Sequence, residues 1–304
     1  MQFVSRKLKI GTRSSPLAIF QAKQIQKHID YLGFDSEIIS IESQGDNDLI
    51  LPLYELGIQG IFTKTLDTAL LNNKIDIAVH SLKDVPTRLP AGLLLAAVSE
   101  RTNAKDVLVF KDGFDMHESS VIATSSLRRK AQWLNKYPNH RIENIRGNIN
   151  LRLDKLERST KWDGAIFAAI GLQRLQILPK QSIILDWMVP APAQGAIGVI
   201  CRDDDLFVKN TCLQINHEST SFEVMVERGI LKGCFGGCTM PLGAKASIQG
   251  GYINIEAVLL SEDGQDIVSV KKSLQITYPE GISQVIVGEL LDKGAQQILD
   301  NLSK

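Results

Sequence analysis

Residues 75–86 read Ile-Asp-Ile-Ala-Val-His-Ser-Leu-Lys-Asp-Val-Pro. The apolar run predicts a strand over 75–80, which ends in polar and charged groups before Pro86 stops the backbone ladder. Ligands of open α/β sheets bind beyond the carboxyl ends of the strands. Lys83 and Asp84 therefore form a candidate charge pair in a binding site. The alternative is a structural turn that Asp84 caps.

The composition is that of a globular chain without a charge bias. Its 304 residues predict two or three domains, at about 100–150 residues each. Hydrophobic residues make up 44% and charged residues 22%, and 34 basic residues balance 34 acidic ones. A net charge of zero argues against bulk nucleic-acid binding, although it leaves room for a local basic pocket.

Cysteines occur at positions 201, 212, 234 and 238, too few and too clustered for a disulfide framework. Residues 1–15 lack the apolar core of a signal peptide, and no apolar run is long enough to span a membrane. We therefore expect a reduced, cytoplasmic protein with no membrane partner. We also expect no metal site, because the histidines are scattered and three residues separate the last two cysteines.

Strands and helices alternate over the first two thirds of the chain, as they do in mostly parallel sheets. The first set has strands at 8–11, 36–43 and 75–80 and helices at 16–32 and 62–71. Ser14 or Ser15 is the expected N-cap of the first helix, with Pro16 at its first position. The second set has strands at 106–110, 121–124, 142–145 and 163–169 and helices at 127–135, capped by Ser125 or Ser126, and 149–158. A turn or a helix is expected after the strand at 163–169.

The remaining sequence predicts a change of architecture. A helix at 222–232 precedes two antiparallel strands at 252–260 and 265–276 and a terminal helix at 282–302. The fold class is therefore α/β, with two doubly wound domains and a small C-terminal α+β domain. The expected domains are 1–99 with 200–218, 104–193, and 220–304, and residues 190–201 form a crossover between the first two.

Arginine recurs at the predicted junctions of strands and helices. The positions are Arg13, Arg128, Arg129, Arg146, Arg152 and Arg174. Helix N-termini attract anions, and guanidinium groups bind carboxylates in bidentate fashion, at about 1.5–3 kcal/mol for each charge-assisted bond. The pattern favours a ligand that carries many carboxylates. The alternative for any one of them is a solvated surface arginine.

Two further residues are candidates for chemistry. Cys238 follows two glycines in a loop, where an accessible thiol could be a covalent attachment point or a turn cysteine without a role. His80 lies within the strand at 75–80, where a core histidine is the more common interpretation than a catalyst. The chain has no dinucleotide or phosphate-binding glycine motif.

Eight motifs in order resemble the hydroxymethylbilane synthase family, also called the porphobilinogen deaminase family. They are Gly11-Thr-Arg-Ser-Ser-Pro-Leu-Ala18, Gly60-Ile-Phe-Thr-Lys64, Asp76-Ile-Ala-Val-His-Ser-Leu-Lys-Asp-Val-Pro86, Thr124-Ser-Ser-Leu-Arg-Arg129, Arg146-Gly-Asn148 with Arg152-Leu-x-Lys-Leu156, Gly171-Leu-Gln-Arg-Leu175, Gln194-Gly-Ala196 and Gly236-Gly-Cys238. Together they extend over about 230 residues, which makes the resemblance highly specific.

The resemblance implies a three-domain fold whose first two domains are similar to periplasmic binding proteins. It implies a dipyrromethane cofactor attached through a thioether to Cys238. Enzymes of this family join four porphobilinogen molecules head to tail with loss of ammonia, and water then releases hydroxymethylbilane for haem biosynthesis. The resemblance further implies a monomeric enzyme with a small-molecule substrate and no nucleic-acid partner.

The resemblance also assigns roles to individual residues. Asp84 would be the catalytic residue, which protonates the leaving amine and stabilises the azafulvene-type cation. Binding of the cofactor is assigned to Cys238, Lys83, Asp84, Ser15, Ser81, Thr124, Arg128, Arg129 and Arg146. Binding of the substrate is assigned to Arg13, Arg146, Arg152 and Arg174.

The sequence departs from the family pattern at several positions. Gln59 stands where lysine is common, Leu151 where threonine is usual, and Ile170 where alanine is usual. Ala193 replaces glycine and Ile200 replaces glutamate. None of these changes affects the residues to which the resemblance assigns catalysis, so we expect the protein to be active. The sequence does not determine the reaction rate or the affinity for the cofactor.

Two other classes of function compete with this one. An arginine-lined pair of α/β lobes could bind an anionic metabolite without chemistry, but such a module would have no use for both Asp84 and Cys238. A nucleotide-type α/β enzyme is disfavoured because the phosphate loops are missing.

Overall fold

The computed structural model describes residues 6–42, 63–234 and 240–302. By their contacts the residues of the chain fall into two compact units. Of the described residues, the first unit comprises 6–42, 63–102 and 195–221, and the second comprises 103–194, 222–234 and 240–302.

The first unit contains a five-stranded sheet in the order β2-β1-β3-β10-β4. The strands are β1 (Leu8–Arg13), β2 (Ser36–Ile41), β3 (Ile77–Ser81), β4 (Leu93–Val98) and β10 (Ile197–Arg202). β1 is parallel to both β2 and β3, whereas β10 is antiparallel to both of its neighbours. The sheet is therefore mostly parallel, as predicted, with one inserted strand that runs the other way.

Helices cover both faces of this sheet. α1 (Pro16–Tyr31) and α7 (Leu206–Leu213) bury apolar side chains in one core with β1, β3 and β10. α3 (Lys64–Leu71) lies against the other face, where a Cβ at Gly11 would collide with Ile75 and approach Leu66. The predicted capping of α1 is confirmed, because the Ser15 hydroxyl accepts a hydrogen bond from the Ala18 amide over 3.4 Å.

The second unit contains a sheet of the same design, in the order β7-β6-β8-β5-β9. Its strands are β5 (Asp106–Phe110), β6 (Val121–Ala123), β7 (Arg141–Glu143), β8 (Gly164–Ala168) and β9 (Ser182–Leu185). β6 is parallel to β7 and β8, and β5 is antiparallel to β8 and β9. The helices that follow its parallel strands are α4 (Leu127–Lys136), α5 (Ile149–Arg158) and α6 (Ala169–Arg174).

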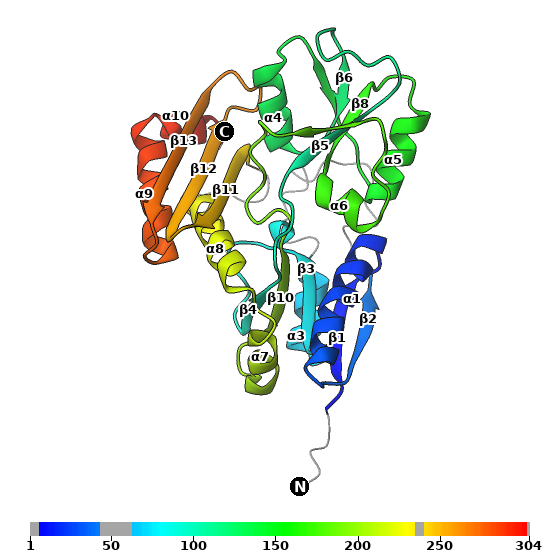
Figure 1. The fold of residues 1–304 in the computed structure, drawn as a ribbon, viewed down its shortest axis with the longest axis vertical. Helices are drawn as coiled ribbons and strands as arrows, with labels where there is room; N and C mark the ends of the chain where they lie inside the picture. Colours follow the sequence, from blue (N-terminus) through cyan, green and yellow to red (C-terminus); the bar gives the residue numbers. More distant parts are fainter. Residues whose placement is uncertain (1–5, 43–62, 235–239, 303–304) are drawn as a thin grey trace. The chain divides into compact units, whose positions relative to one another are not determined.

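Each sheet receives its antiparallel strand just after the chain has passed from the other unit. β5 follows β4 and enters the second sheet, and β10 follows β9 and enters the first (Figure 1). The segment 190–201, predicted as a crossover, thus ends as the inserted strand β10. The first sheet therefore cannot form from one continuous stretch of the chain, whereas all five strands of the second sheet lie within residues 106–185.

A third, three-stranded sheet belongs to the second unit. Its antiparallel strands are β11 (Leu242–Gln249), β12 (Tyr252–Leu260) and β13 (Ile267–Gln275), and its helices are α8 (Glu218–Gly233), α9 (Pro279–Asp292) and α10 (Ala295–Leu302). One face of the sheet shares a core with the three helices (Figure 1). At the end of β12, Val258 and Leu260 pack against Ala131 of α4 and Val189.

The predicted fold class is confirmed, and the errors concern individual elements. The predicted terminal helix is two helices, because Gly294 adopts a φ of 98° between them. β4, β9, β11 and α7 were not predicted. The division into three domains stays a prediction. Within the described ranges, no helix has the length and apolar character that crossing a membrane requires.

The turn between β12 and β13 offers a test of how the third sheet docks on α4. Gly264 has a φ of 74°, and a Cβ there would lie 2.4 Å from the Ala131 carbonyl oxygen. Asn135 also donates a hydrogen bond to the Gly264 carbonyl oxygen over 2.8 Å. We expect Gly264→Ala to lower the free energy of unfolding by about 2–4 kcal/mol in urea titrations, from backbone strain and collision together.

Gly250→Ala is the matched control for this variant. Gly250 has a φ of 58° but nothing within 4 Å of the added Cβ, so only the backbone contribution of about 1–2 kcal/mol should appear. Equal losses in the two variants would show that the contact with α4 contributes nothing to stability.

Candidate active site

In the first unit, the predicted residues follow the ends of two neighbouring strands. Arg13 is the last residue of β1 and Ser81 the last residue of β3, and these strands are parallel. Lys83 and Asp84 lie in the single 3₁₀ turn directly after β3. The turn is fixed by the buried side chains of Leu82 and Val85, so its two charged residues remain half-buried at the carboxyl edge of the sheet.

Two predicted serines make hydrogen bonds with α1. The Ser15 hydroxyl is the N-cap described above, and the Ser81 hydroxyl accepts a hydrogen bond from the Gln21 side-chain amide over 2.9 Å. Gln21 is only 3% exposed, and the sequence reasoning missed it. The available signal was a polar residue close to the apolar stripe of the predicted helix. Gln21 ties the end of β3 to α1 and thereby steadies the turn that carries Asp84.

His80 is a core residue, as predicted, but its ring is incompletely hydrogen-bonded. It is 5% exposed, and among the described residues its Nε2 atom has no hydrogen-bond partner. Burial, together with the positive charge of Arg13, lowers the pKa of His80 to about 4. The imidazole is therefore neutral at physiological pH.

In the second unit, the predicted residues again follow parallel neighbouring strands. Thr124 follows β6, Arg146 follows β7, and Arg174 ends the helix that follows β8. Arg128 and Arg129 lie in the first turn of α4, whose N-cap is Ser126. The carboxyl ends of parallel strands meet at one edge of a sheet, so the fold places Thr124, Arg146 and the arginine pair of α4 at the edge where α/β proteins bind ligands. Arg174 lies one short helix beyond the end of β8.

Burial distinguishes these arginines from ordinary surface residues. Arg128, Arg129 and Arg146 are 4%, 6% and 9% exposed, which excludes the solvated alternative for all three. Burial lowers the pKa of Arg174 to about 10. The guanidinium carbon of Arg152 lies 5.1 Å from the ring centre of the buried Phe167, within the range of a cation–π contact.

The buried carboxylate that faces this positive charge was not predicted. Asp106, the first residue of β5, is fully buried and accepts hydrogen bonds from Arg128 Nη1 over 2.7 Å and from Arg129 Nη2 over 2.8 Å. Gln194 donates to the same carboxylate over 2.9 Å. Although burial opposes ionisation, the two guanidinium groups hold the pKa of Asp106 well below its usual range.

The helices that begin at these edges are themselves suited to anions. α1, α4 and α5 have no acidic residue in the first turn, a feature that they share with α6, α7 and α10, whereas α3 and α9 have Asp67 and Glu280 there. A helix N-terminus carries partial positive charge that an acidic side chain normally offsets. The absence of acidic residues from these first turns leaves that charge available to a ligand.

Thr124 lies in the same loop as the arginine pair. Its side chain is buried, and its hydroxyl oxygen lies 3.3 Å from the Ser126 amide, from which it accepts a hydrogen bond. The loop between β6 and α4 is therefore held by its own side chains. This fixes the direction in which α4 begins.

The predicted attachment residue, Cys238, lies outside the described residues, as does Gln59. The other cysteines are buried, and burial raises the pKa of Cys234 to about 11. Cys234 is therefore a poor nucleophile at neutral pH. Within the described part of the chain, no group of three or more histidine, cysteine, aspartate or glutamate residues is arranged to hold a metal ion.

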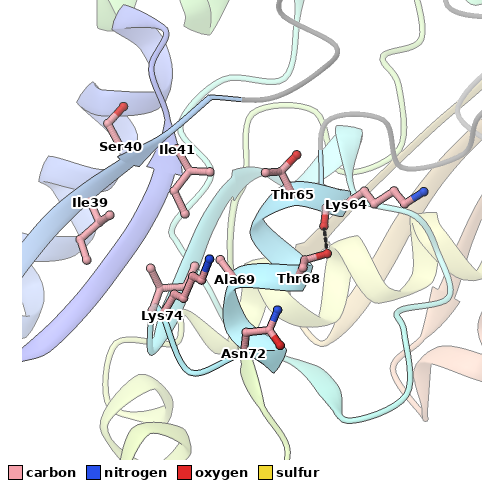
Figure 2. Close-up of a pocket in the computed structure, with 10 residues that line it drawn as sticks. Ile39, Ser40, Ile41, Lys64, Thr65, Thr68, Ala69, Asn72 and Lys74 are labelled. Carbon is pink, nitrogen blue, oxygen red and sulfur yellow. Dashed lines mark hydrogen bonds between the residues drawn. The ribbon is translucent and has the colours of Figure 1, made fainter.

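A cavity of about 530 Å³ lies in the first unit, away from the predicted set. Figure 2 shows its lining residues from β2, from α3 and from the start of the segment before β3. They are Ile39, Ser40, Ile41, Lys64, Thr65, Thr68, Ala69, Asn72, Lys74 and Ile75. None of the predicted catalytic or binding residues lines it, so we assign it no part in the site.

Two departures from the family pattern have clear structural settings. Ala193 adopts a φ of 61°, a conformation in which glycine is unstrained. Its amide donates to the buried Glu227 carboxylate over 2.7 Å, which holds it in place. Ile200 lies fully buried in β10, where an apolar side chain fits the core.

Comparisons with known proteins agree with the motifs. The family model described as the dipyrromethane cofactor binding domain of porphobilinogen deaminase matches residues 8–210, and the model of the C-terminal domain of porphobilinogen deaminase matches residues 221–292. A porphobilinogen deaminase of Synechococcus elongatus is 38% identical over 98% of this chain and 96% of its own length. A porphobilinogen deaminase of Pelobacter propionicus is 36% identical over 98% of this chain and 97% of its own length.

Solved structures show a more distant likeness. The L-cystine solute receptor of Neisseria gonorrhoeae aligns with 80% of this chain and 95% of its own, at 14% identity and a TM-score of 0.42. The GluR0 ligand-binding core of Nostoc punctiforme aligns with 68% of this chain and 90% of its own, at 16% identity and a TM-score of 0.37.

The setting of His80 predicts a pH dependence of stability. Because its folded pKa of about 4 lies below the ordinary 6.5, the neutral ring contributes stability that is present above pH 6.5 and is lost as the pH falls toward 4. The shift corresponds to about 3 kcal/mol. Denaturant unfolding at pH 7.5 and 4.5 should show a smaller loss on acidification for His80→Gln than for the unmodified chain.

His117→Gln is the control, since His117 is exposed. It should lose as much stability on acidification as the unmodified chain. If His80→Gln does so too, the buried ring does not titrate in the way described.

Proposed function

The chain belongs to the porphobilinogen deaminase family, and we propose that it carries out the polymerisation of porphobilinogen with the residues placed above. Its product belongs to tetrapyrrole biosynthesis, and its cofactor is dipyrromethane. The observation that carries the assignment of residues is the buried positive charge of the second unit. Arg128, Arg129 and Arg146 are buried there, and Asp106 is the carboxylate that pairs with the first two.

The described residues fit a dipyrromethane, whose two pyrroles carry acetate and propionate groups. Buried guanidinium groups that lack a full complement of carboxylates need anionic partners. The Nε atom of Arg128 is buried and has no hydrogen-bond partner among the described residues, which suits a ligand carboxylate. When bound, the dipyrromethane supplies a pyrrole carbon to which the next porphobilinogen is joined.

The arginines bind and orient the anionic chain. Arg128, Arg129 and Arg146, with Lys83, Ser15, Ser81 and Thr124, would hold the cofactor. Arg13, Arg146, Arg152 and Arg174 would hold the carboxylates of the incoming porphobilinogen. Bidentate contacts fix a carboxylate in direction as well as position, so they align the reacting carbons. Each added pyrrole brings two more carboxylates, which is why so many guanidinium groups serve one substrate.

Asp84 would act as the acid that protonates the leaving amine and as the carboxylate that stabilises the positive charge left at the reacting carbon. Its carboxyl group would protonate the leaving amine of porphobilinogen, so that ammonia departs. As a carboxylate it would then stabilise the positive charge left on the substrate and orient the pyrrole N–H groups. The turn that carries Asp84 is anchored by Leu82 and Val85, and such a rigid support suits a residue that acts on several successive substrates.

Cys238 keeps the growing chain on the enzyme. A thioether to its sulfur would prevent the intermediate from diffusing away between additions, since the tether holds the reactive end at high effective concentration. The cytoplasm, where thiols stay reduced, suits this chemistry, and we include that location and a monomeric state in the proposal. Light scattering after size exclusion tests the latter.

Intact-mass spectrometry tests the attachment. Protein from cells that make porphobilinogen should be heavier than its sequence by two linked pyrrole units, and Cys238→Ser should abolish the increment. Cys234→Ser is the control and should keep it, because Cys234 is buried with a raised pKa. An unmodified, folded wild-type protein would count against the proposed function.

Steady-state kinetics tests the acid. Asp84→Ala should leave the fold intact, as judged by circular dichroism, and lower kcat by about 10²–10⁴-fold, the usual contribution of general acid–base catalysis. Asp112→Ala is the control, because Asp112 is exposed and lies outside the predicted set. Unchanged turnover in Asp84→Ala would remove Asp84 from its role.

A further inference from the structure

Asp106 occupies an unusual position for a residue with no predicted function. It is the first residue of β5, it is 0% exposed, and it carries a full negative charge. Its Oδ1 atom accepts hydrogen bonds from Arg129 Nε over 3.1 Å and Nη2 over 2.8 Å, and its Oδ2 atom from Arg128 Nη1 over 2.7 Å. One carboxylate therefore serves two guanidinium groups from consecutive residues.

The charges of this cluster do not cancel. Two arginines and one aspartate leave one positive charge, and both arginines lie in the first turn of α4, where the helix dipole is also positive. A simple structural ion pair would need only one arginine, and excess buried charge is unfavourable unless something compensates it. The cluster is electrostatically complete when one ligand carboxylate joins it.

The two arginines make different contacts. Arg129 directs Nε and Nη2 to Asp106 and Nη1 to the Ile166 carbonyl oxygen over 2.9 Å, so every nitrogen of its guanidinium group is engaged. Arg128 uses Nη1 for both Asp106 and the Val189 carbonyl oxygen over 2.8 Å. Its Nε atom is buried and has no partner among the described residues.

We propose that Asp106 is a positioning residue for both arginines. It fixes the guanidinium group of Arg129, whose nitrogens are all engaged within the protein. It also holds Arg128 so that the remaining donors of Arg128 receive one carboxylate of the pyrrole ligand. This inference rests on the proposed function and separates two arginines that the sequence motif treats alike. Gln194 completes the arrangement, since its amide donates to Asp106 over 2.9 Å and to the Ala104 carbonyl oxygen over 2.7 Å.

Asp106→Asn tests the proposal, because it keeps the size of the side chain and removes its charge. Wild-type and variant proteins are produced in cells that make porphobilinogen, and the folded, monodisperse fraction is analysed by intact mass. We expect the share of Asp106→Asn molecules that carry the two pyrrole units to fall at least tenfold. A full increment on the folded variant would overturn the positioning role.

Asp76→Asn is the matched control for a purely structural effect. Asp76 is 6% exposed and forms salt bridges with Arg6 and Arg202 in the first unit, outside the predicted set. Both variants should lose stability, but Asp76→Asn should carry the increment as fully as the wild type. If Asp76→Asn loses it equally, buried ion pairs in general are required and the inference fails. A wild type without the increment would instead refute the proposed function.

A second variant covers the case in which Asp106→Asn does not fold. Gln194→Met removes one donor to Asp106 at nearly constant volume and leaves both arginines and the carboxylate in place. Its cofactor-free protein, mixed with porphobilinogen, should gain the pyrrole units several-fold more slowly than the wild type, with an unchanged final mass. An unchanged rate would overturn the proposal.

Discussion

Burying positive charge without unfolding the chain is the constraint on which the second unit depends. An arginine in the interior loses its hydration, and the loss is recovered only where carboxylates or carbonyl oxygens replace the water. Asp106 and the carbonyl oxygens of Ile166 and Val189 do so for the arginine pair of α4. One of the two positive charges has no carboxylate partner in this cluster. A fold that leaves an uncompensated positive charge at the binding edge of a sheet is suited to bind an anion.

The local patterns of the sequence predicted the parts of the structure that depend on local physics. The capping of α1 by Ser15 and the strand limits of β5 and β12 follow from neighbouring residues, and they were correct. The antiparallel insertions were beyond such reasoning, because strand direction in a sheet depends on partners far away in the chain. β4, with the sequence Leu-Leu-Leu-Ala-Ala-Val, lacks the alternation that marks a half-buried strand.

The candidate site likewise contains residues that local sequence patterns predicted and residues that they did not. Arg128, Arg129 and Asp84 stand at junctions that the alternation of strands and helices indicates, so the sequence could nominate them. Asp106 could not be nominated, because an isolated aspartate at a strand start is common on protein surfaces. Gln21 gave only a weak signal, since it is a polar residue close to the apolar stripe of its helix. Their roles arise from contacts across 22 and 60 positions of the chain, which no local spacing records.

The path of the chain explains why Asp106 can serve in this way. β5 is the strand that enters the second sheet directly after the chain leaves the first unit, and Gln194 is the last residue of the second unit before the chain returns. The hydrogen bonds from Gln194 to Asp106 and to the Ala104 carbonyl oxygen therefore join the two connecting segments side by side. The arginine pair is oriented by a carboxylate on one connection that is held in turn by an amide on the other. A mutation in either connection would disturb anion binding without touching an arginine, because the direction of each guanidinium group depends on where that carboxylate lies.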